Sequence, residues 1–156
     1  MTRTQTLEQL LVTSSRLVRL AAQAAGNATP SAVWRTLSIL DAEGAMRVGE
    51  LAAASRVSQP GMTRLLGGMD DDGLVTRSAD AADSRAFIIG ITPVGREALA
   101  GWRDTLARTL EPWFADLPDA DWAALERSVA ILAERTASPT ASPAATSPAT
   151  AQEERA

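Results

Sequence analysis

The 156-residue sequence contains no cysteine, no histidine, no tyrosine and no lysine, and its 15 basic residues are all arginine. Without cysteine there is no disulfide, no thiolate ligand and no thiol that could act as a nucleophile or redox sensor. Without histidine and lysine the chain lacks the most common general base, the most common metal ligand and the Schiff-base amine. We therefore predict a protein that is not an enzyme and that uses no metal and no cofactor.

Long apolar runs are also missing, since no stretch approaches the ~20 apolar residues of a membrane-spanning helix. We expect no membrane partner and a cytoplasmic location. Residues 7–25 are amphipathic and poor in acidic residues, which is also typical of a mitochondrial transit peptide. The net charge of −4 has the wrong sign for a protein that coats nucleic acid regardless of sequence, but local clusters of arginine can still form a basic surface.

Apolar residues at helical spacing predict a long first helix within residues 4–26. Thr29 and Pro30 supply an N-cap and a first-turn proline for a second helix that ends at Gly44. Two short helices are expected at 48–55 and from Ser58 to about residue 71. Two longer helices follow, one from Thr92-Pro93 to about residue 113 and one after Pro118.

Between the short and the long helices the period changes to two, so residues 74–77 and 85–91 are predicted to form a β-hairpin with a polar loop at 78–84. Residues 138–156 contain little besides Ala, Ser, Thr and Pro, and we expect this tail to be disordered. The predicted fold is mostly α with a small β-hairpin wing: a winged helix-turn-helix core at about 29–99 within a single domain of residues 1–137.

The helix that begins at Ser58 has the character of a DNA-reading helix. Its apolar stripe leaves polar residues on the other side, and arginine pairs with guanine as glutamine pairs with adenine in the major groove. The expected DNA-binding residues of this helix are Ser58, Gln59, Pro60, Thr63 and Arg64. At the hairpin tip, the Arg85 guanidinium is suited to enter a narrow minor groove. Asp83 could orient Arg85 through a charge-assisted hydrogen bond. The alternative is an ordinary solvated polar face and a surface ion pair of little consequence.

Several stretches in the same order resemble the MarR family of bacterial transcriptional regulators. They are "TPSAVWRTLSILDAEG" (29–44), "VGELAAASRVSQPGMTRLL" (48–66), "DGLVTR" (72–77), "DSR" (83–85) and "ITPVGREAL" (91–99). The resemblance implies a homodimer whose long terminal helices, about 4–26 and 92–137, interleave, and which binds a palindromic double-stranded DNA operator as a repressor. It also implies that Arg85 reads the minor groove with Asp83 as its support. Gly61 departs from the family pattern, which has Thr or Ser there, and this puts one DNA contact in doubt.

The resemblance further implies a small-molecule effector, often an aromatic carboxylate, that releases the DNA. Arg16 and Arg19 on the first helix and Trp34 and Arg35 on the second could hold such an anion, because a cation near an indole suits an aromatic acid. In the alternative, Trp34 belongs to the core, Arg16 and Arg19 are solvated, and Arg35 contacts a phosphate.

Two other functions stay open at this point. A winged-helix adaptor that binds protein rather than specific DNA agrees with the acidic net charge. A carboxylate-pair hydrolase would need a second acidic cluster near Asp70–Asp72, and none is evident in the sequence. Gly67 and Gly68 interrupt the proposed DNA-reading helix, which implies either a loose helix or a close approach of another backbone.

Overall fold

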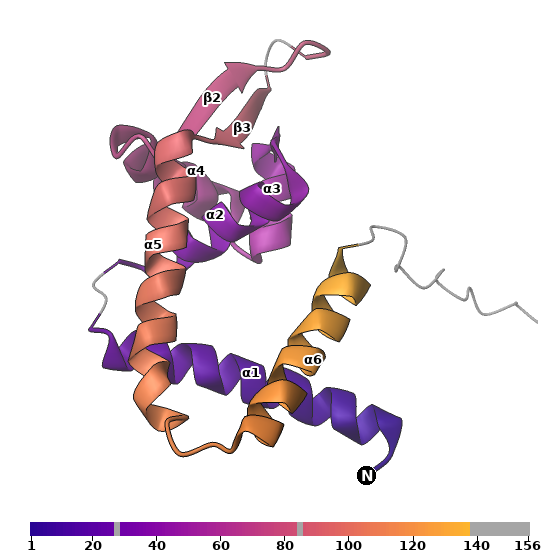
Figure 1. Cartoon of the computed structure of the whole chain (residues 1–156). Coiled ribbons are helices and arrows are strands. Elements are labelled where there is room, and N and C mark those ends of the chain that lie inside the picture. Colours follow the sequence, from indigo (N-terminus) through magenta and orange to yellow (C-terminus); the bar gives the residue numbers. More distant parts are fainter. Residues whose placement is uncertain (27–28, 84–85, 138–156) are drawn as a thin grey trace, which may run out of the picture. The chain divides into compact units, whose positions relative to one another are not determined.

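The computed structural model describes residues 1–26, 29–83 and 86–137, and the chain forms two units, Met1–Trp113 and Phe114–Ala156. Arg85 and the tail 138–156, both subjects of predictions above, lie outside the described residues. The first unit contains α1 (Arg3–Ala24), α2 (Ser31–Glu43), β1 (Met46–Arg47), α3 (Val48–Ser55), α4 (Gln59–Asp71), β2 (Val75–Ala79), β3 (Phe87–Ile91), α5 (Pro93–Leu110) and the short 3-10 helix η1 (Glu111–Trp113). The second contains α6 (Asp119–Thr136) (Figure 1). The predicted class, mostly helical with a small β-hairpin wing, is confirmed.

Two helix ends differ from the sequence-based expectation. Helix α2 begins one residue later than predicted, with Pro30 itself at the N-cap position and no side-chain cap. Thr29 therefore does not act as the N-cap. At the other end of the unit, α5 gives way to η1 after Leu110 instead of continuing to Trp113. Pro112 has no N–H to donate to the helical ladder, which accounts for this change.

The sheet has three antiparallel strands in the order β1-β3-β2. The predicted hairpin is present, with Val75 opposite Ile91 and Ala79 opposite Phe87. Its strands cover 75–79 and 87–91, so the first continues two residues further, and the second begins two residues later, than the sequence pattern indicates. Strand β1, where Met46 pairs with Ile89, was not predicted, because two residues are too short to show a period.

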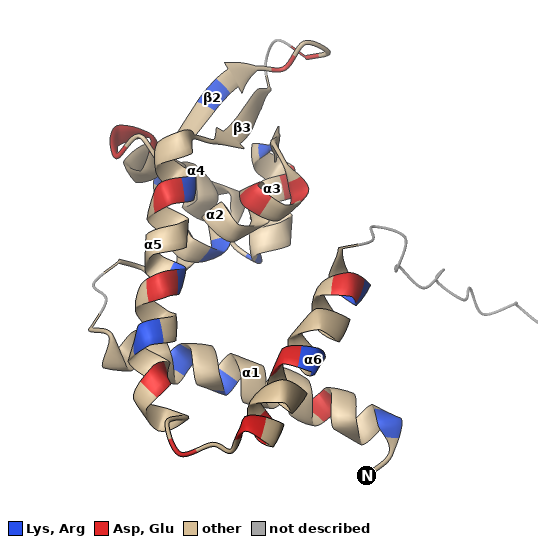
Figure 2. Ribbon diagram, in the orientation of Figure 1, with Lys and Arg blue, Asp and Glu red and all other residues tan. Residues whose placement is uncertain are grey.

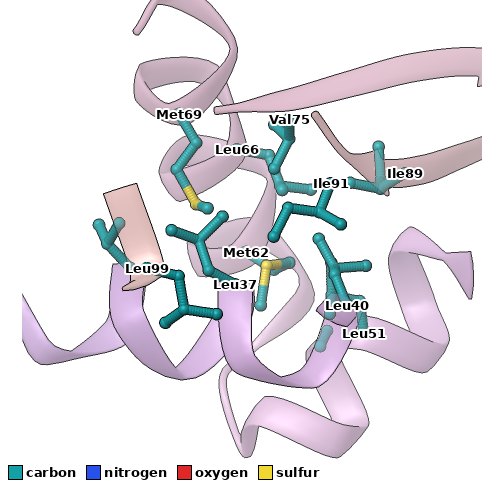
Figure 3. Packing of buried hydrophobic residues seen from close by; sticks show 12 residues of the cluster. Leu37, Leu40, Leu51, Met62, Leu66, Met69, Val75, Ile89, Ile91 and Leu99 are labelled. Carbon is teal, nitrogen blue, oxygen red and sulfur yellow. The ribbon is translucent and has the colours of Figure 1, made fainter. Parts of the chain in front are cut away.

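A single apolar cluster joins α2, α3, α4, the sheet and α5 (Figure 3). The predicted stripe of α4 supplies Met62, Leu66 and Met69, all buried. They meet Leu37 of α2 and Leu99 of α5, both at most 1% exposed. This packing fixes which side of α4 faces the interior, and therefore which side is left for solvent or a ligand.

Helix α5 is tied closely to the start of the wing. The Thr92 hydroxyl accepts a hydrogen bond from the Gly95 N–H at 2.9 Å, as the cap prediction requires, and donates to the Gly73 carbonyl at 2.6 Å. A Cβ at Gly95 would lie 2.1 Å from the Leu74 carbonyl oxygen. Glycine at position 95 therefore permits this close approach of helix and backbone.

The apolar stripe of α1 is only partly covered within its unit. Ala21 is buried against the rest of the first unit, but Leu7, Leu11 and Val18 are 60%, 70% and 51% exposed. In the second unit, α6 has no buried residue, and Trp122, Leu125, Val129 and Leu132 on its predicted stripe are all exposed. No helix of the described residues is both long and apolar enough to cross a membrane.

Candidate nucleic-acid interface

Helices α3 and α4 are joined by a tight turn at Arg56 and Val57. Arg56 has φ 54° and ψ 42°, the left-handed region, which for a residue other than glycine costs about 1 kcal/mol. This geometry lets the Arg56 N–H donate to the Ala53 carbonyl at 3.1 Å and the Val57 N–H to the Ala52 carbonyl at 3.0 Å. The turn thus satisfies the last carbonyls of α3 and sets the direction in which α4 departs.

Helix α4 begins as the sequence predicted. The Ser58 hydroxyl accepts a hydrogen bond from the Gly61 N–H at 3.3 Å, and Pro60 lies in the first turn, where no helical donor is needed. A Cβ at Gly61 would lie only 3.0 Å from the Ser58 Oγ, so glycine leaves room for this cap. The Ser58 hydroxyl can still donate its own proton outward.

The outer side of α4 carries the other predicted residues. Gln59, Thr63 and Arg64 are all exposed, opposite the buried stripe. The Thr63 hydroxyl donates to the Gln59 carbonyl at 3.0 Å, and its oxygen can still accept a hydrogen bond. The structure therefore brings Ser58, Gln59, Pro60, Thr63 and Arg64 together on the exposed first two turns of one helix.

Charge is distributed unevenly around this helix (Figure 2). No carboxylate of the described residues forms an ion pair with Arg64, whereas Arg77 of β2 lies 3.6 Å from Asp70 at the far end of α4. The acidic run Asp70–Asp72 lies at that C-terminal end. The beginning of α4 is thus free of acidic partners, and no group of three or more metal-ligating side chains gathers in the described part of the chain.

The start of the wing loop is held by an ion pair that the sequence did not reveal. The Arg47 Nε of β1 donates to an Asp80 carboxylate oxygen at 2.6 Å, and the other Asp80 oxygen accepts from the Ala82 N–H at 2.9 Å. These bonds, first that from Ala82 and then that from Arg47, lower the pKa of Asp80 below 3.8. The Asp80 N–H donates to the Ala86 carbonyl at 3.0 Å, so the two ends of the loop between β2 and β3 are hydrogen-bonded to each other. Asp83 is exposed beside it.

The glycine pair of α4 meets no neighbour. A Cβ at Gly67 or at Gly68 would have no atom within 4 Å in the described structure outside the adjoining helix backbone. A close approach of another part of this chain therefore does not explain the two glycines. The helix nevertheless continues through both of them to Asp71.

A cavity of about 730 Å³ lies between α1, α2 and α5. Arg19, Trp34 and Arg35 line it, as predicted for a ligand site, whereas Arg16 lines a separate shallow depression on α1. Trp34 stacks on Trp102 with ring centroids 5.1 Å apart and planes 9° apart. The sequence did not single out Trp102 for this site, because helical spacing does not distinguish a core residue from one that lines a cavity. The Arg35 guanidinium donates to the Ser55 carbonyl at 3.3 Å.

Comparison with known proteins agrees with this architecture. A family model described as MarR family matches residues 29–86, which include α2, α3, α4 and β2 and end just before β3. This part of the chain is therefore similar to the MarR family. Curated relatives in Mycobacterium bovis and Mycobacterium tuberculosis, named HTH-type transcriptional regulators, are each 34% identical over 80 residues. Each match covers 51% of this chain and 53% of the relative, so the chain spans about half the length of the curated relatives that it matches.

Solved structures of transcriptional regulators share the fold over most of the chain. A transcriptional regulator from Thermotoga maritima is 24% identical, with a TM-score of 0.66, and covers 84% of this chain and 96% of its own. A MarR-family regulator from Silicibacter pomeroyi is 26% identical, with a TM-score of 0.51, and covers 85% of this chain and 89% of its own. The MarR fold therefore includes the long helices on either side of the winged core.

Proposed function

We propose that this chain is a cytoplasmic transcriptional repressor of the MarR family and that it binds double-stranded DNA through α4. The observation that carries the proposal is the exposed polar start of α4, where Gln59, Thr63 and Arg64 project opposite a fully buried stripe. A helix of this kind fits the major groove, where glutamine and arginine make bidentate contacts with adenine and guanine. Ser58 and Pro60, at the start of the helix, lie beside the phosphate backbone.

The hairpin supplies the second contact. The strands β2 and β3 carry the loop beyond the helical core of the first unit (Figure 1). Arg85 enters the minor groove, which attracts guanidinium groups where it is narrow, and Asp83 orients it. The Arg47–Asp80 pair supports this placement, because it fixes the start of the loop against β1.

The protein acts as a homodimer on a palindromic operator. Exposed apolar residues on α1, namely Leu7, Leu11 and Val18, and the uncovered stripe of α6 support this, since such faces are normally buried against a partner. A two-fold dimer places two copies of α4 about 34 Å apart, one turn of DNA.

A small aromatic anion regulates binding from the cavity beside α1 and α2. Its stacked tryptophans offer an apolar wall, and Arg19 and Arg35 offer positive charge at the same cavity. Benzoate and naphthoate are suitable probes, with cyclohexanecarboxylate as the non-aromatic control. Binding should quench tryptophan fluorescence and weaken DNA binding together, and quenching without any change in DNA affinity would contradict the regulatory part of the proposal.

Selection from a library of randomised duplexes, followed by fluorescence anisotropy on the recovered sites, tests DNA binding itself. The proposal predicts recovered sequences with two-fold symmetry that bind about 10³-fold or more tightly than scrambled duplexes. Recovery of no common sequence would contradict it. That result, together with salt-insensitive binding to a protein, would favour the alternative of a protein-binding adaptor.

A further inference from the structure

Arg56 has an unusual backbone conformation in this chain. It is the one residue other than glycine with a positive φ in the described structure, while the remaining positive-φ positions are occupied by Gly26, Gly44 and Gly73. With Arg56 in this left-handed conformation, the Arg56 and Val57 N–H groups donate to carbonyls at the end of α3. Glycine would adopt it without steric cost, so an arginine here is explained by what its side chain does.

The side chain of Arg56 is exposed and has no ion pair among the residues that the structure describes. It forms no ion pair with any carboxylate of the described residues, in contrast to Arg47, Arg77 and Arg103, which contact Asp80, Asp70 and Asp41. Its position is also specific, because it precedes Ser58 by two residues and so lies directly before α4. A free cation therefore stands immediately before the helix that carries Gln59, Thr63 and Arg64.

We propose that Arg56 binds a phosphate of the DNA backbone and so anchors the start of α4 over the groove. This assignment rests on the proposed DNA binding and adds to it a contact that carries no base preference. A cation at the C-terminal end of a helix also interacts favourably with the helix dipole, so Arg56 could instead serve α3 alone. The two roles predict different results when the side chain is removed.

The test compares the full-length protein with Arg56→Gly and Arg56→Lys, using a fluorescein-labelled duplex recovered by the selection described above and a scrambled duplex. Anisotropy titrations over a range of salt give the slope of log affinity against log salt. One phosphate contact contributes about 0.9 to this slope and about eightfold in affinity at 0.1 M salt. For each bound protomer, Arg56→Gly should reduce the slope by about 0.9 and the affinity about eightfold on both duplexes. Arg56→Lys should keep the wild-type slope. The Tm of Arg56→Gly should not fall.

Arg3→Ala is the matched control, because Arg3 is exposed and lacks an ion pair among the described residues but lies on α1. It should leave the slope unchanged. If Arg56→Gly has the same salt slope as the wild-type protein, Arg56 does not bind a phosphate and the assignment is overturned. If its Tm is also lowered, the role of Arg56 is to stabilise the end of α3. If the wild-type protein binds neither duplex, the proposed function itself fails, which is a distinct result from binding that is indifferent to Arg56.

Discussion

At the scale of single residues, contacts of individual atoms determine which residue types fit at a position and which charged side chains are paired. Glycine is required at position 95 because a Cβ would collide with the Leu74 carbonyl, whereas Gly101 on the same helix meets nothing. Arg64 has no ion pair with an acidic residue in the described part of the chain, whereas Arg77 of β2 is paired with Asp70 at the end of α4. At this scale the sequence shows which residue type is present but not which atoms it meets.

We predict that Gly95→Ala destabilises the protein by about 1–3 kcal/mol, the usual range for forced overpacking. The alanine Cβ has no rotamer to change and the Leu74 carbonyl belongs to the backbone, so a change of rotamer cannot relieve the contact. Gly101→Ala on the exposed side of α5 is the control, and it should stabilise the helix by up to about 1 kcal/mol. Urea denaturation of both variants measures the difference, and equal stabilities would show that α5 is not held against Leu74.

Arg64→Ala is predicted to lower affinity for the selected duplex by about 1–3 kcal/mol and to relax base preference at one position of each half-site. The physical reason is the loss of a bidentate contact with a base. Competition titrations against duplexes substituted at each position report the preference. A uniform loss on every duplex, with no change in preference, would assign Arg64 to a phosphate instead.

At the scale of elements, the helices were predictable and their connections were not. The stripe Met62, Leu66 and Met69 and the Ser58 cap determine α4 locally, so its buried and exposed sides could be read from the sequence. Strand β1 depends on pairing with β3, and the Arg47–Asp80 contact joins residues 33 positions apart. Contacts between residues far apart in the sequence leave no pattern in the neighbouring residues from which they could be predicted. The same holds for the stack of Trp34 on Trp102.

The pKa of Asp80 leads to a prediction for the wing. A lowered folded-state pKa means that the Arg47–Asp80 contact is fully present above pH 3.8, the ordinary value, and is lost as the pH falls through the lowered value. With no histidine in the chain, DNA affinity should be nearly constant between about pH 5.5 and 7.5. Anisotropy titrations across this range check the expectation, and a steep change near pH 6.5 would contradict it.

Asp80→Asn should mimic protonation and weaken DNA binding several-fold at neutral pH, because the start of the loop loses its charged anchor. The double exchange Arg47→Asp with Asp80→Arg should restore much of the affinity. Thermal unfolding serves as the control, since the Arg47 side chain is 45% exposed and the Asp80→Asn variant should therefore change Tm little. Equal binding by all three proteins would show that the pair does not position the wing.

At the scale of the whole molecule, α1 and α6 each expose an apolar face that a single chain does not cover. Apolar spacing predicted both helices correctly, but spacing alone does not say whether a face is covered by the same chain or by a second copy. We predict a dimer in dilute solution, and Val129→Glu on α6 should shift it toward monomer because a charge would be buried. Sedimentation velocity measures the shift, and a wild-type monomer would contradict the dimer.

The central claim is that α4 reads DNA in two symmetric copies. Its most direct test is the affinity of the wild-type protein for three duplexes: the selected site, the same site with one half scrambled, and the fully scrambled sequence. The account predicts that affinity falls at each step and that log affinity declines linearly with log salt for all three. Equal affinity for the three duplexes, or no dependence on salt, would contradict it.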